Sequence, residues 1–388
     1  MDPIIIIGTG VAGYTLAREF RKLDTEQALI MISSDDGRNY PKPMLSNALT
    51  KGKTADQVAM SDAGKMAETL SATIMTEQTV VKIDRQNKSL ILALGEAIKY
   101  NKLVLAVGAE PVRLKLEGDA ADAALSVNNL IDYTAFRSKL ATAKHVAIIG
   151  SGLIGCEFAN DLGNVGIAVS VIGPSEVPMN SLLPRQIAIE LQQALTNIGV
   201  NWHLGTTATT INSVNDQYDV RLGSGESVVA DLVVSAVGLK ANIKLAQSAA
   251  LVINRGIVTD RYLQTSDPNI YAIGDCAEVS GHHLMYIAPT LLAAKALAQT
   301  LTGTPMIVNY PAMPVAVKTP SYPLIICPPP INVEGFWQLE HNKTGSGIKG
   351  LFFDEKGVLL GFALSGDMTS QKQVYIKMLP DLLSSIPV

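Results

Sequence analysis

A single glycine pattern occurs twice in the sequence, and this repetition limits the folds open to the chain more than any other feature. Residues 4–7 are four consecutive isoleucines, which predict a strand buried on both faces. Gly8, Gly10 and Gly13 follow in G-x-G-x-x-G spacing, and residues 16–23 have a helical pattern. In such a unit the first glycine permits a tight turn, the second lets a pyrophosphate approach the backbone, and the third lets helix pack on strand. We therefore predict a dinucleotide site at this turn.

The second copy begins at residue 145. An apolar strand over residues 145–149 leads into Gly150, Gly152 and Gly155, and a helical segment follows over residues 156–162. Two complete copies in one chain are far more specific than one, and they imply two dinucleotides, each bound by its own domain.

Composition excludes several other classes of protein. The chain has 388 residues, of which 47% are hydrophobic, and this is enough for two or three domains with real cores. Its net charge of −4 and the lack of basic stretches argue against nucleic-acid binding. No apolar run reaches the roughly 18 residues that a membrane span requires, and the N-terminus starts directly in a strand. We therefore expect no membrane insertion and a cytoplasmic location.

The three cysteines indicate neither a disulfide framework nor a metal centre. Cys156, Cys276 and Cys327 lie far apart and form no C-x-x-C motif or metal-ligand spacing. We predict that each is a small buried residue, and we expect no metal.

Several further segments carry polar residues at places where a nucleotide fold uses them. A second strand over residues 28–32 is followed by Ser33 and Ser34, which we expect at the adenosine ribose, with Asp35 as a neighbour. Residues 38–46 are too rich in proline for a regular element, and Lys42 lies there between two prolines.

The remaining periodicity predicts alternating elements. A strand over residues 269–273 ends at Gly274 and delivers Asp275 to a loop or helix start, where a short acceptor suits a sugar hydroxyl. Further helices are predicted over residues 56–70, 132–140 and 289–301, and further strands over 79–84, 89–92, 103–107, 168–172, 231–237, 314–319, 324–326, 350–353 and 358–364.

The chain resembles two-dinucleotide flavoprotein reductases of the glutathione-reductase fold. The two glycine patterns and the sequence I-Y-A-I-G-D-C-A-E at 270–278 carry this resemblance over nearly the whole chain. Within that group, residues 40–49, 151–162 and 313–320 resemble rubredoxin reductases. The resemblance implies FAD and NADH as cofactors, rubredoxin as the partner, and a place in alkane hydroxylation.

The implied fold class is α/β. Two Rossmann-like three-layer dinucleotide-binding domains, with the NAD domain inserted in the FAD domain, precede a small α+β C-terminal domain. The expected boundaries are 1–112 and 239–312 for the two FAD segments, 113–238 for the NAD domain and 313–388 for the C-terminal domain.

The resemblance also assigns residues to the two cofactors. For FAD these are Gly8, Thr9, Gly10, Val11, Ala12, Gly13, Ser33, Ser34, Lys42, Val81, Glu157, Asp275, Ile287 and Lys318. For NAD they are Gly150, Gly152, Leu153, Ile154, Gly155, Glu176 and Gly238.

The catalytic residues expected from the resemblance are Lys42 and Glu157, as an ion pair beside the flavin. Reduced flavin carries negative charge, which a fixed cation stabilises, and Glu157 would neutralise and orient that buried lysine. Lys318 would lie near the flavin ring, and together with Lys372 and Lys377 it would steer an acidic rubredoxin. The alternatives are solvated side chains for Lys42 and Lys318, and for Glu157 an exposed position in the first helical turn, favoured by the helix dipole.

Two departures from the family pattern shape the expected chemistry. Residues 35–50 contain no cysteine, and Asn47 stands where some relatives carry a reactive one, so electrons must leave the flavin without a thiol relay. The acid expected after the second strand of the NAD unit is missing, because Gly173 follows that strand. We expect Glu176 to reach the ribose instead, and, since no arginine stands there to receive a 2′-phosphate, we expect NADH to be preferred.

Residues alone leave the electron acceptor open. An NADH-dependent ferredoxin reductase, an NADH oxidase that passes electrons to oxygen, and a non-catalytic nucleotide sensor all fit the same fold.

Overall fold

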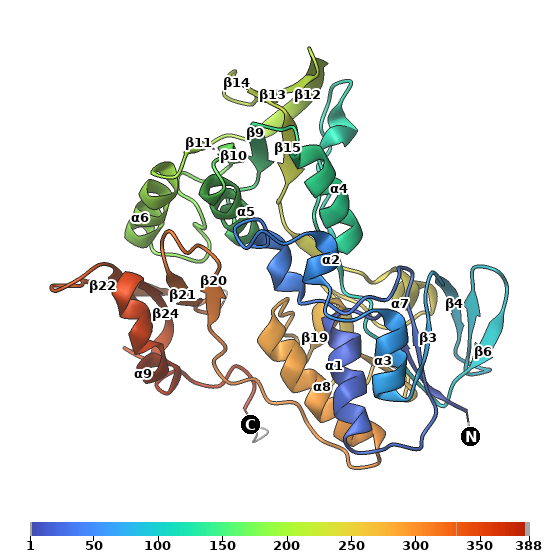
Figure 1. Cartoon of the computed structure of the whole chain (residues 1–388). Coiled ribbons are helices and arrows are strands. Elements are labelled where there is room, and N and C mark those ends of the chain that lie inside the picture. Colours follow the sequence, from blue (N-terminus) through green and yellow to red (C-terminus); the bar gives the residue numbers. More distant parts are fainter. Residues whose placement is uncertain (1, 331, 385–388) are drawn as a thin grey trace.

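The computed structural model describes residues 2–330 and 332–384 (Figure 1). Its first layer is a parallel five-stranded sheet in the order β18-β7-β1-β2-β3. The bounds are β1 (Ile4–Ile7), β2 (Leu29–Ile32), β3 (Thr73–Met75), β7 (Lys102–Leu105) and β18 (Ile270–Ala272). β1 is fully buried, as predicted, because strands lie on both sides of it and helices cover the sheet. β18 comes from a segment more than 160 residues further along the chain than β7, so a late segment of the chain completes this sheet.

Helices α1 (Val11–Arg21) and α8 (Ile287–Leu301) pack side by side against this sheet, as the neighbouring blue and orange helices of Figure 1 show. Their buried side chains join those of the strands in one hydrophobic core. The other elements of this part are η1 (Lys42–Ser46), α2 (Ala55–Val58), α3 (Ala63–Leu70), β4 (Val80–Asp84), β5 (Ser89–Leu92), β6 (Ala97–Lys99), β8 (Ala109–Pro111), β16 (Leu239–Ala241), α7 (Lys244–Ser248), β17 (Ile257–Thr259), η3 (Gly274–Cys276) and β19 (Ala277–Val279).

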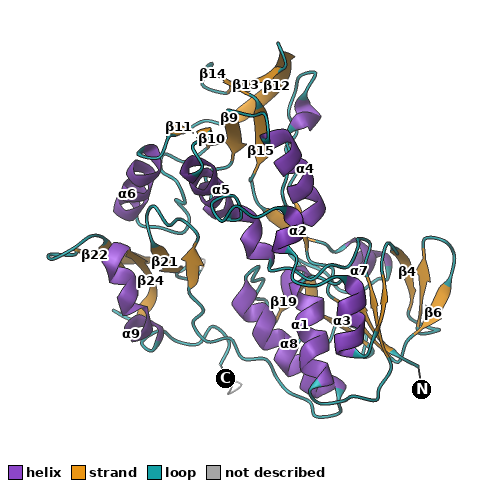
Figure 2. Cartoon of the chain, viewed as in Figure 1, coloured by secondary structure: helices purple, strands orange, loops and turns teal. Residues whose placement is uncertain are grey.

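The middle of the chain repeats the architecture on a second parallel sheet, in the order β11-β10-β9-β15. Figure 2 shows helices flanking these strands, and a separate antiparallel sheet lies beyond them. The bounds are η2 (Ala121–Ala123), α4 (Leu130–Leu140), β9 (His145–Ile149), α5 (Leu153–Asn164), β10 (Ala168–Gly173), α6 (Arg185–Thr196), β11 (Val200–Leu204), β12 (Ala208–Val214), β13 (Gln217–Leu222), β14 (Ser227–Ala230) and β15 (Leu232–Ser235).

The C-terminal part is an antiparallel sheet in the order β20-β21-β24-β23-β22 with a short helix on it. Its elements are β20 (Val315–Val317), β21 (Leu324–Cys327), β22 (Gly335–His341), β23 (Ile348–Asp354), β24 (Leu359–Ser365), η4 (Gly366–Gln371) and α9 (Lys372–Ile376). The predicted α+β character is confirmed. The edge strand β22 was not expected, because its residues are exposed at almost every position and lack a two-residue apolar period.

The chain leaves and re-enters the first sheet region at one place. Tyr310 precedes the C-terminal sheet and Leu383 follows it. The two residues exchange a pair of backbone hydrogen bonds of 3.0 Å each. Leu382 and Leu383 pack against the core of the first sheet. The guanidinium of Arg261 donates to the carbonyls of Val308 and Ser384, which holds the two strands of this junction together.

Two local predictions were wrong. The segment 56–70 is not one helix: Ala59 is extended, Met60 donates its N–H to the carbonyl of Asn39, and Asp62 caps a new helix through the N–H of Lys65. Residues 42–46 form a 3₁₀ helix rather than irregular loop, with Pro43 in its first turn, where a missing N–H costs nothing. Of the helices in the described part of the chain, none is long and apolar enough to cross a membrane.

Candidate dinucleotide and redox site

The first glycine turn joins β1 to α1 and has the geometry that a dinucleotide requires. Gly8 has φ +113°, and a Cβ atom there would lie 2.2 Å from the carbonyl oxygen of Ala106 on the neighbouring strand. A Cβ at Gly13 would lie 1.9 Å from the carbonyl oxygen of Gly8, so only glycine lets the helix approach the strand this closely. A Cβ at Gly10 would meet nothing within 4 Å. This turn is therefore closed at two glycines and open at the third, where a pyrophosphate would lie on the N–H groups of the helix start.

The second turn, between β9 and α5, repeats this arrangement. A Cβ atom at Gly150 would lie 2.4 Å from the carbonyl oxygen of Ala236, and one at Gly155 would lie 1.9 Å from the carbonyl oxygen of Gly150. A Cβ atom at Gly152 would meet nothing within 4 Å. Leu153 and Ile154 form the start of α5. Gly238 follows β15 with φ +116° and open space around it. Both turns therefore fit a dinucleotide, although the roles of the individual residues stay predictions.

The predicted ribose residues lie beside the first turn. The hydroxyl of Thr9 donates to the hydroxyl of Ser33 at 2.7 Å, and Ser33 donates to Asp35 at 2.5 Å. Ser33 is buried and Ser34 is exposed. The segment that leads to Val81 is held here by the N–H of Gln78, which donates to the Ser33 carbonyl at 2.8 Å. Val81 itself lies at a β-bulge and is 51% exposed.

Asp275 reaches the same turn from the far end of the sequence. It lies in η3, directly after β18, and a Cβ at the preceding Gly274 would lie 2.8 Å from the Cβ of Ala12 in α1. Burial raises the pKa of Asp275, while Lys42 and His283 act in the opposite direction. Ile287 begins α8 close by in the chain and is 38% exposed. The fold therefore brings the segment of Asp275 against the start of α1, and the role of Asp275 toward FAD stays a prediction.

Lys42 is the first residue of η1, and burial lowers its pKa, with Asp275 as the largest opposing influence. Among the described residues it forms no ion pair with Glu157, so the predicted Lys42–Glu157 pair is wrong. Lys42 has intermediate exposure, so it is neither fully solvated nor buried, and its role toward the flavin stays a prediction.

Glu157 pairs with Lys318 instead. The Lys318 ammonium lies 2.5 Å from Oε2 of Glu157, and the Lys318 backbone N–H donates to Oε1 at 3.0 Å. The hydroxyl of Ser46 donates to Oε2 at 2.7 Å. The Glu157 side chain has no exposed surface, whereas that of Lys318 is 24% exposed. Both predicted site residues are therefore brought together, and the exposed alternative for Glu157 is excluded.

These contacts belong to a polar face of α5 that binds loops from both other parts of the chain. Asp161 accepts from the backbone N–H groups of Leu49 and Thr50, at 3.0 and 2.8 Å. Asn160 accepts from the N–H of Ser321 at 3.2 Å. Nothing in the sequence singled out these residues or Ser46, because a polar residue in a helix is usually read as solvent-facing.

The cysteines are buried and chemically quiet, as predicted. All three are free, and burial raises the thiol pKa of each, to about 12 for Cys276 and about 11 for Cys327. Asn47 follows η1, and its side-chain oxygen is buried without a hydrogen-bond partner in the described structure. A thiol relay has no residue to carry it in this loop.

The loop after β10 contains a group that the sequence did not reveal. Glu176 forms an ion pair with Arg185, the first residue of α6, at 2.9 Å. The expectation that no arginine stands beside Glu176 is wrong. Arg185 is nine residues further along the sequence, but the fold places its guanidinium next to the carboxylate of Glu176.

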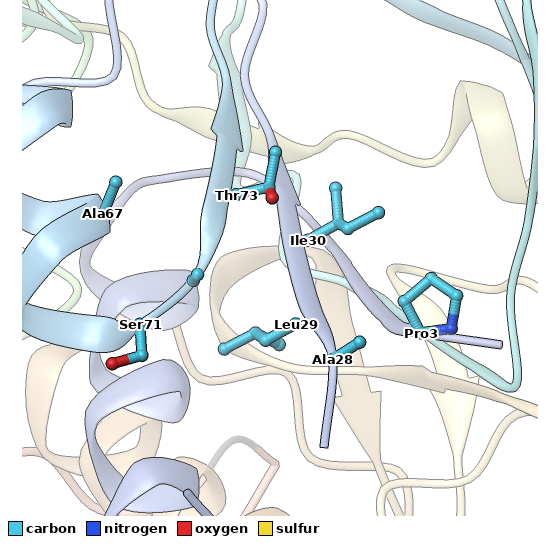
Figure 3. A pocket seen from close by; sticks show the side chains of 8 residues that line it. Pro3, Ala28, Leu29, Ile30, Ala67, Ser71 and Thr73 are labelled. Atoms are coloured by element: carbon cyan, nitrogen blue, oxygen red, sulfur yellow. The ribbon is translucent and has the colours of Figure 1, made fainter. Parts of the chain in front are cut away.

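A hollow of about 540 Å³ lies elsewhere, at the starts of β1, β2 and β3, and is lined by residues that include Pro3, Leu29 and Thr73 (Figure 3). Nucleotides bind at the opposite, carboxyl ends of such strands. This hollow is therefore not the dinucleotide site.

Each of the two parallel sheets has a glycine turn with free space at its second glycine. This arrangement is typical of a protein that binds two dinucleotides. The chain belongs to the pyridine nucleotide-disulphide oxidoreductase family, which matches residues 2–300. FAD and NAD(H) are accordingly its cofactors. Residues 307–379 match a second family, described as the rubredoxin binding C-terminal domain.

Known relatives extend along the whole chain. It is 47% identical to a rubredoxin-NAD(+) reductase of Acinetobacter baylyi over 391 residues, covering 99% of each chain. It is 44% identical to a rubredoxin-NAD(+) reductase of Alcanivorax borkumensis over 384 residues, covering 99% of this chain and 100% of the relative. Among solved structures, a ferredoxin reductase from Rhodopseudomonas palustris superimposes with a TM-score of 0.87 at 27% identity, covering 98% of this chain and 96% of that one.

Proposed function

We propose that this chain is an FAD-dependent reductase that takes a hydride from NADH and passes the electrons to rubredoxin. The observation that carries the proposal is the match of residues 307–379 to the rubredoxin binding C-terminal domain, in the same chain as a two-dinucleotide reductase. The near full-length identity to two rubredoxin-NAD(+) reductases supports it.

The chain's own residues have distinct parts in this proposal. The open turns at Gly10 and Gly152 hold the two pyrophosphates, with Asp275 at the first of them. Bound FAD supplies hydride acceptance and single-electron release. Lys42 and the Lys318–Glu157 pair supply fixed charge beside it, at partly buried positions where solvent screens charge less than in water. The other residues assigned to FAD and NAD from the sequence keep the same proposed roles.

The positions of the three cysteines bear on how electrons leave the flavin. All three cysteines are buried, and none lies in the loop over residues 35–50. We propose that the partner accepts electrons directly at the flavin edge, one at a time, through a small and transient contact.

The biological setting is part of the same proposal. The resemblance to rubredoxin reductases supports a role in alkane hydroxylation, and the use of NADH supports a cytoplasmic location. The domain boundaries at residues 112, 238 and 312 also stay proposals, which limited proteolysis with mass spectrometry of the fragments would test.

The decisive experiment measures bleaching of rubredoxin by NADH and the purified protein under argon. The same assay with a [2Fe–2S] ferredoxin, and an oxygen-consumption assay without rubredoxin, test the ferredoxin reductase and the NADH oxidase. We expect rubredoxin to be reduced much faster than either alternative acceptor. Equal rates would leave a flavoprotein reductase without this specificity, and a colourless protein that FAD cannot reconstitute would exclude the enzyme altogether.

A further inference from the structure

Two lysine side chains meet at one amide oxygen beside the first sheet. The ammonium groups of Lys88 and Lys102 lie 3.1 and 3.4 Å from Oδ1 of Asn269. The Lys102 ammonium also donates to the carbonyl of Pro268 at 3.1 Å. Within the described residues, neither lysine forms an ion pair with a carboxylate. Two positive charges therefore share a neutral acceptor, and no carboxylate in contact with them offsets their repulsion.

The backbone around both lysines is fixed by hydrogen bonds. Lys88 ends the turn between β4 and β5 in the left-handed conformation, with φ +46°, and its carbonyl accepts from the N–H of Tyr100 at 2.9 Å. Lys102 is the first residue of β7. The next residue, Leu103, donates its N–H to the carbonyl of Asn269 at 2.9 Å. The fold itself thus brings the two side chains to the same amide.

This surrounding changes the acid–base behaviour of Lys102. Burial lowers the pKa of Lys102 and the charge of Lys88 lowers it further, whereas Asp267 acts in the opposite direction. The carboxylate of Asp267 is itself engaged by Arg85 at 2.8 Å. The ring of Tyr271, whose centroid is 5.8 Å from Nζ of Lys102, also favours the charged form. Because the net pKa is lowered, more of Lys102 than of an ordinary lysine is the neutral amine, which is the nucleophile.

We propose that Lys102 is a site of acylation by small acyl phosphates, and that the ammonium of Lys88 holds the phosphate group of the reagent. Lys88 is exposed and Lys102 is partly exposed, so a small anion can reach both. A charge-assisted hydrogen bond from Lys88 brings the phosphate beside the Lys102 nitrogen. Lys102 is paired with Ile4 at the start of β1, whereas the first glycine turn follows the end of that strand. The site is therefore separate from the cofactor sites.

The reaction needs no further reagent. The lone pair of the neutral Lys102 amine attacks the acyl carbonyl carbon, and the new N–C bond forms as the C–O bond to phosphate breaks. Inorganic phosphate leaves with that electron pair, and the amine proton passes to water. The amide nitrogen keeps one hydrogen for the Pro268 carbonyl. Since acylation removes one of the two charges, the modified protein should stay folded.

The first test treats the purified holoprotein with acetyl phosphate and measures each lysine by mass spectrometry, after digestion with a protease that does not cleave at lysine. We expect Lys102 to be acetylated several-fold faster than Lys99, which is exposed on β6. Lys88→Gln should slow the reaction at Lys102 several-fold. Lys82→Gln is the matched control, because it removes an exposed charge on β4 of the same small sheet, and it should leave the rate unchanged. A rate at Lys102 no higher than at Lys99, or equal effects of the two variants, would overturn the proposal.

A second reagent separates binding of the phosphate from activation of the amine. Acetic anhydride carries no charge, so its reaction at Lys102 depends on the nucleophilicity of the amine alone. Lys88→Gln should therefore slow acetyl phosphate more than acetic anhydride, and inorganic phosphate should compete only with acetyl phosphate. Equal effects on both reagents would mean that Lys88 holds no phosphate, which contradicts the proposal. Neither reaction uses NADH or rubredoxin, so these results do not depend on the proposed electron transfer.

Discussion

Glu157 shows how one buried carboxylate connects three distant parts of a sequence. It lies on α5, and its two oxygens accept from Ser46 in the first part of the chain and from both the backbone and the ammonium of Lys318 in the last part. A carboxylate without exposed surface needs such partners, because an unpaired buried charge is costly. The sequence predicted that Glu157 would neutralise a lysine but gave the wrong one, since the partner is set by how the C-terminal sheet docks.

Removing this charge should destabilise the protein. In Glu157→Gln the ammonium of Lys318 loses its counter-ion, and we expect the free energy of unfolding to fall by about 1–3 kcal/mol. Urea unfolding followed by circular dichroism measures this. Ser46→Ala, which removes only one neutral donor, should cost less. A Glu157→Gln protein as stable as the wild type would show that the pair contributes nothing to folding.

Lys42 makes a separate contribution that should appear in the redox potential. Partial burial lowers the pKa of its ammonium, and the charge of Asp275 acts in the opposite direction, so the two groups interact electrostatically. In Lys42→Met we expect FAD to remain bound, and the flavin potential to fall or hydride transfer to slow, by an amount equivalent to roughly 1.5–3 kcal/mol. Potentiometric titration and stopped flow measure the two effects. Lys51→Met, in an exposed position nearby in the sequence, is the control. If Lys42→Met leaves both quantities unchanged, the lysine has no redox role.

At the scale of elements, the glycine turns and the strands that flank them could be predicted well from sequence. Each turn obeys a local rule: a buried strand, three glycines at fixed spacing, and a helix. The ends of α2 and α3 and the η1 helix could not be predicted, because the Met60–Asn39 hydrogen bond and the Pro43 first turn decide them. The partners of Glu157 and Glu176 could not be predicted either, because those contacts depend on how separate elements pack.

Two alanine substitutions should separate the roles of the glycines within one turn. Gly10→Ala meets nothing within 4 Å, so the protein should fold but bind FAD weakly, because the methyl group enters the space of the pyrophosphate. Gly13→Ala would place a methyl group 1.9 Å from the Gly8 carbonyl oxygen, so it should fail to fold or lose several kcal/mol of stability. Flavin content and thermal unfolding distinguish these outcomes. Gly10→Ala with normal FAD content would contradict the assignment of the first turn.

A second prediction at this scale concerns the contact between the turn after β4 and the loop before β18. The Arg85 guanidinium donates to Asp267 at 2.8 Å. Burial raises the pKa of Asp267, but the hydrogen bonds from Arg85 and Asn269 outweigh it, and the net pKa is lowered. A depressed carboxyl pKa stabilises the fold above the unfolded value, near pH 4, and this stabilisation is lost as the pH falls further.

Asp267→Asn should therefore be less stable at pH 7, by about 1–3 kcal/mol, and should lose less stability than the wild type below about pH 4. Urea unfolding across this pH range measures both effects. Asp122→Asn, at an exposed position on η2, serves as the control and should follow the wild-type curve. Parallel curves for Asp267→Asn and the wild type would exclude the ion pair as a source of acid sensitivity.

At the scale of the whole molecule, the C-terminal sheet is held to the middle of the chain by polar contacts. Besides the Lys318–Glu157 pair, the hydroxyl of Tyr322 donates to Glu190 of α6 at 2.6 Å and lies 2.8 Å from the hydroxyl of Ser365. The part that matches the rubredoxin binding domain is thus in direct contact with helices of the second dinucleotide unit. The C-terminal sheet and the helices of the second dinucleotide unit are thus joined by a set of hydrogen bonds.

Electrostatic steering of an acidic rubredoxin should make its reduction sensitive to salt. The whole chain carries a net charge of −4, so any attraction must be local, and Lys372 and Lys377 are both exposed on or next to α9. We expect the rate to fall several-fold between low salt and about 0.5 M salt. Lys372→Gln/Lys377→Gln should flatten this dependence, whereas Lys22→Gln at the end of α1 should not. Reduction of an uncharged quinone provides the baseline, and a salt dependence equal for quinone and rubredoxin would exclude steering.

The paired backbone hydrogen bonds of Tyr310 and Leu383 bring the start and the end of the C-terminal part together, so this part is a single insertion into the rest of the fold. Its entry and exit strands are neighbours in an antiparallel bridge, so residues 313–380 form a closed excursion from the first sheet region. Both glycine turns lie outside that excursion. A different acceptor module inserted between the same two strands would inherit the same reductase, provided that it brought its own partner for Glu157. One continuous stretch of chain thus contains the proposed acceptor-binding part together with Lys318, the partner of Glu157.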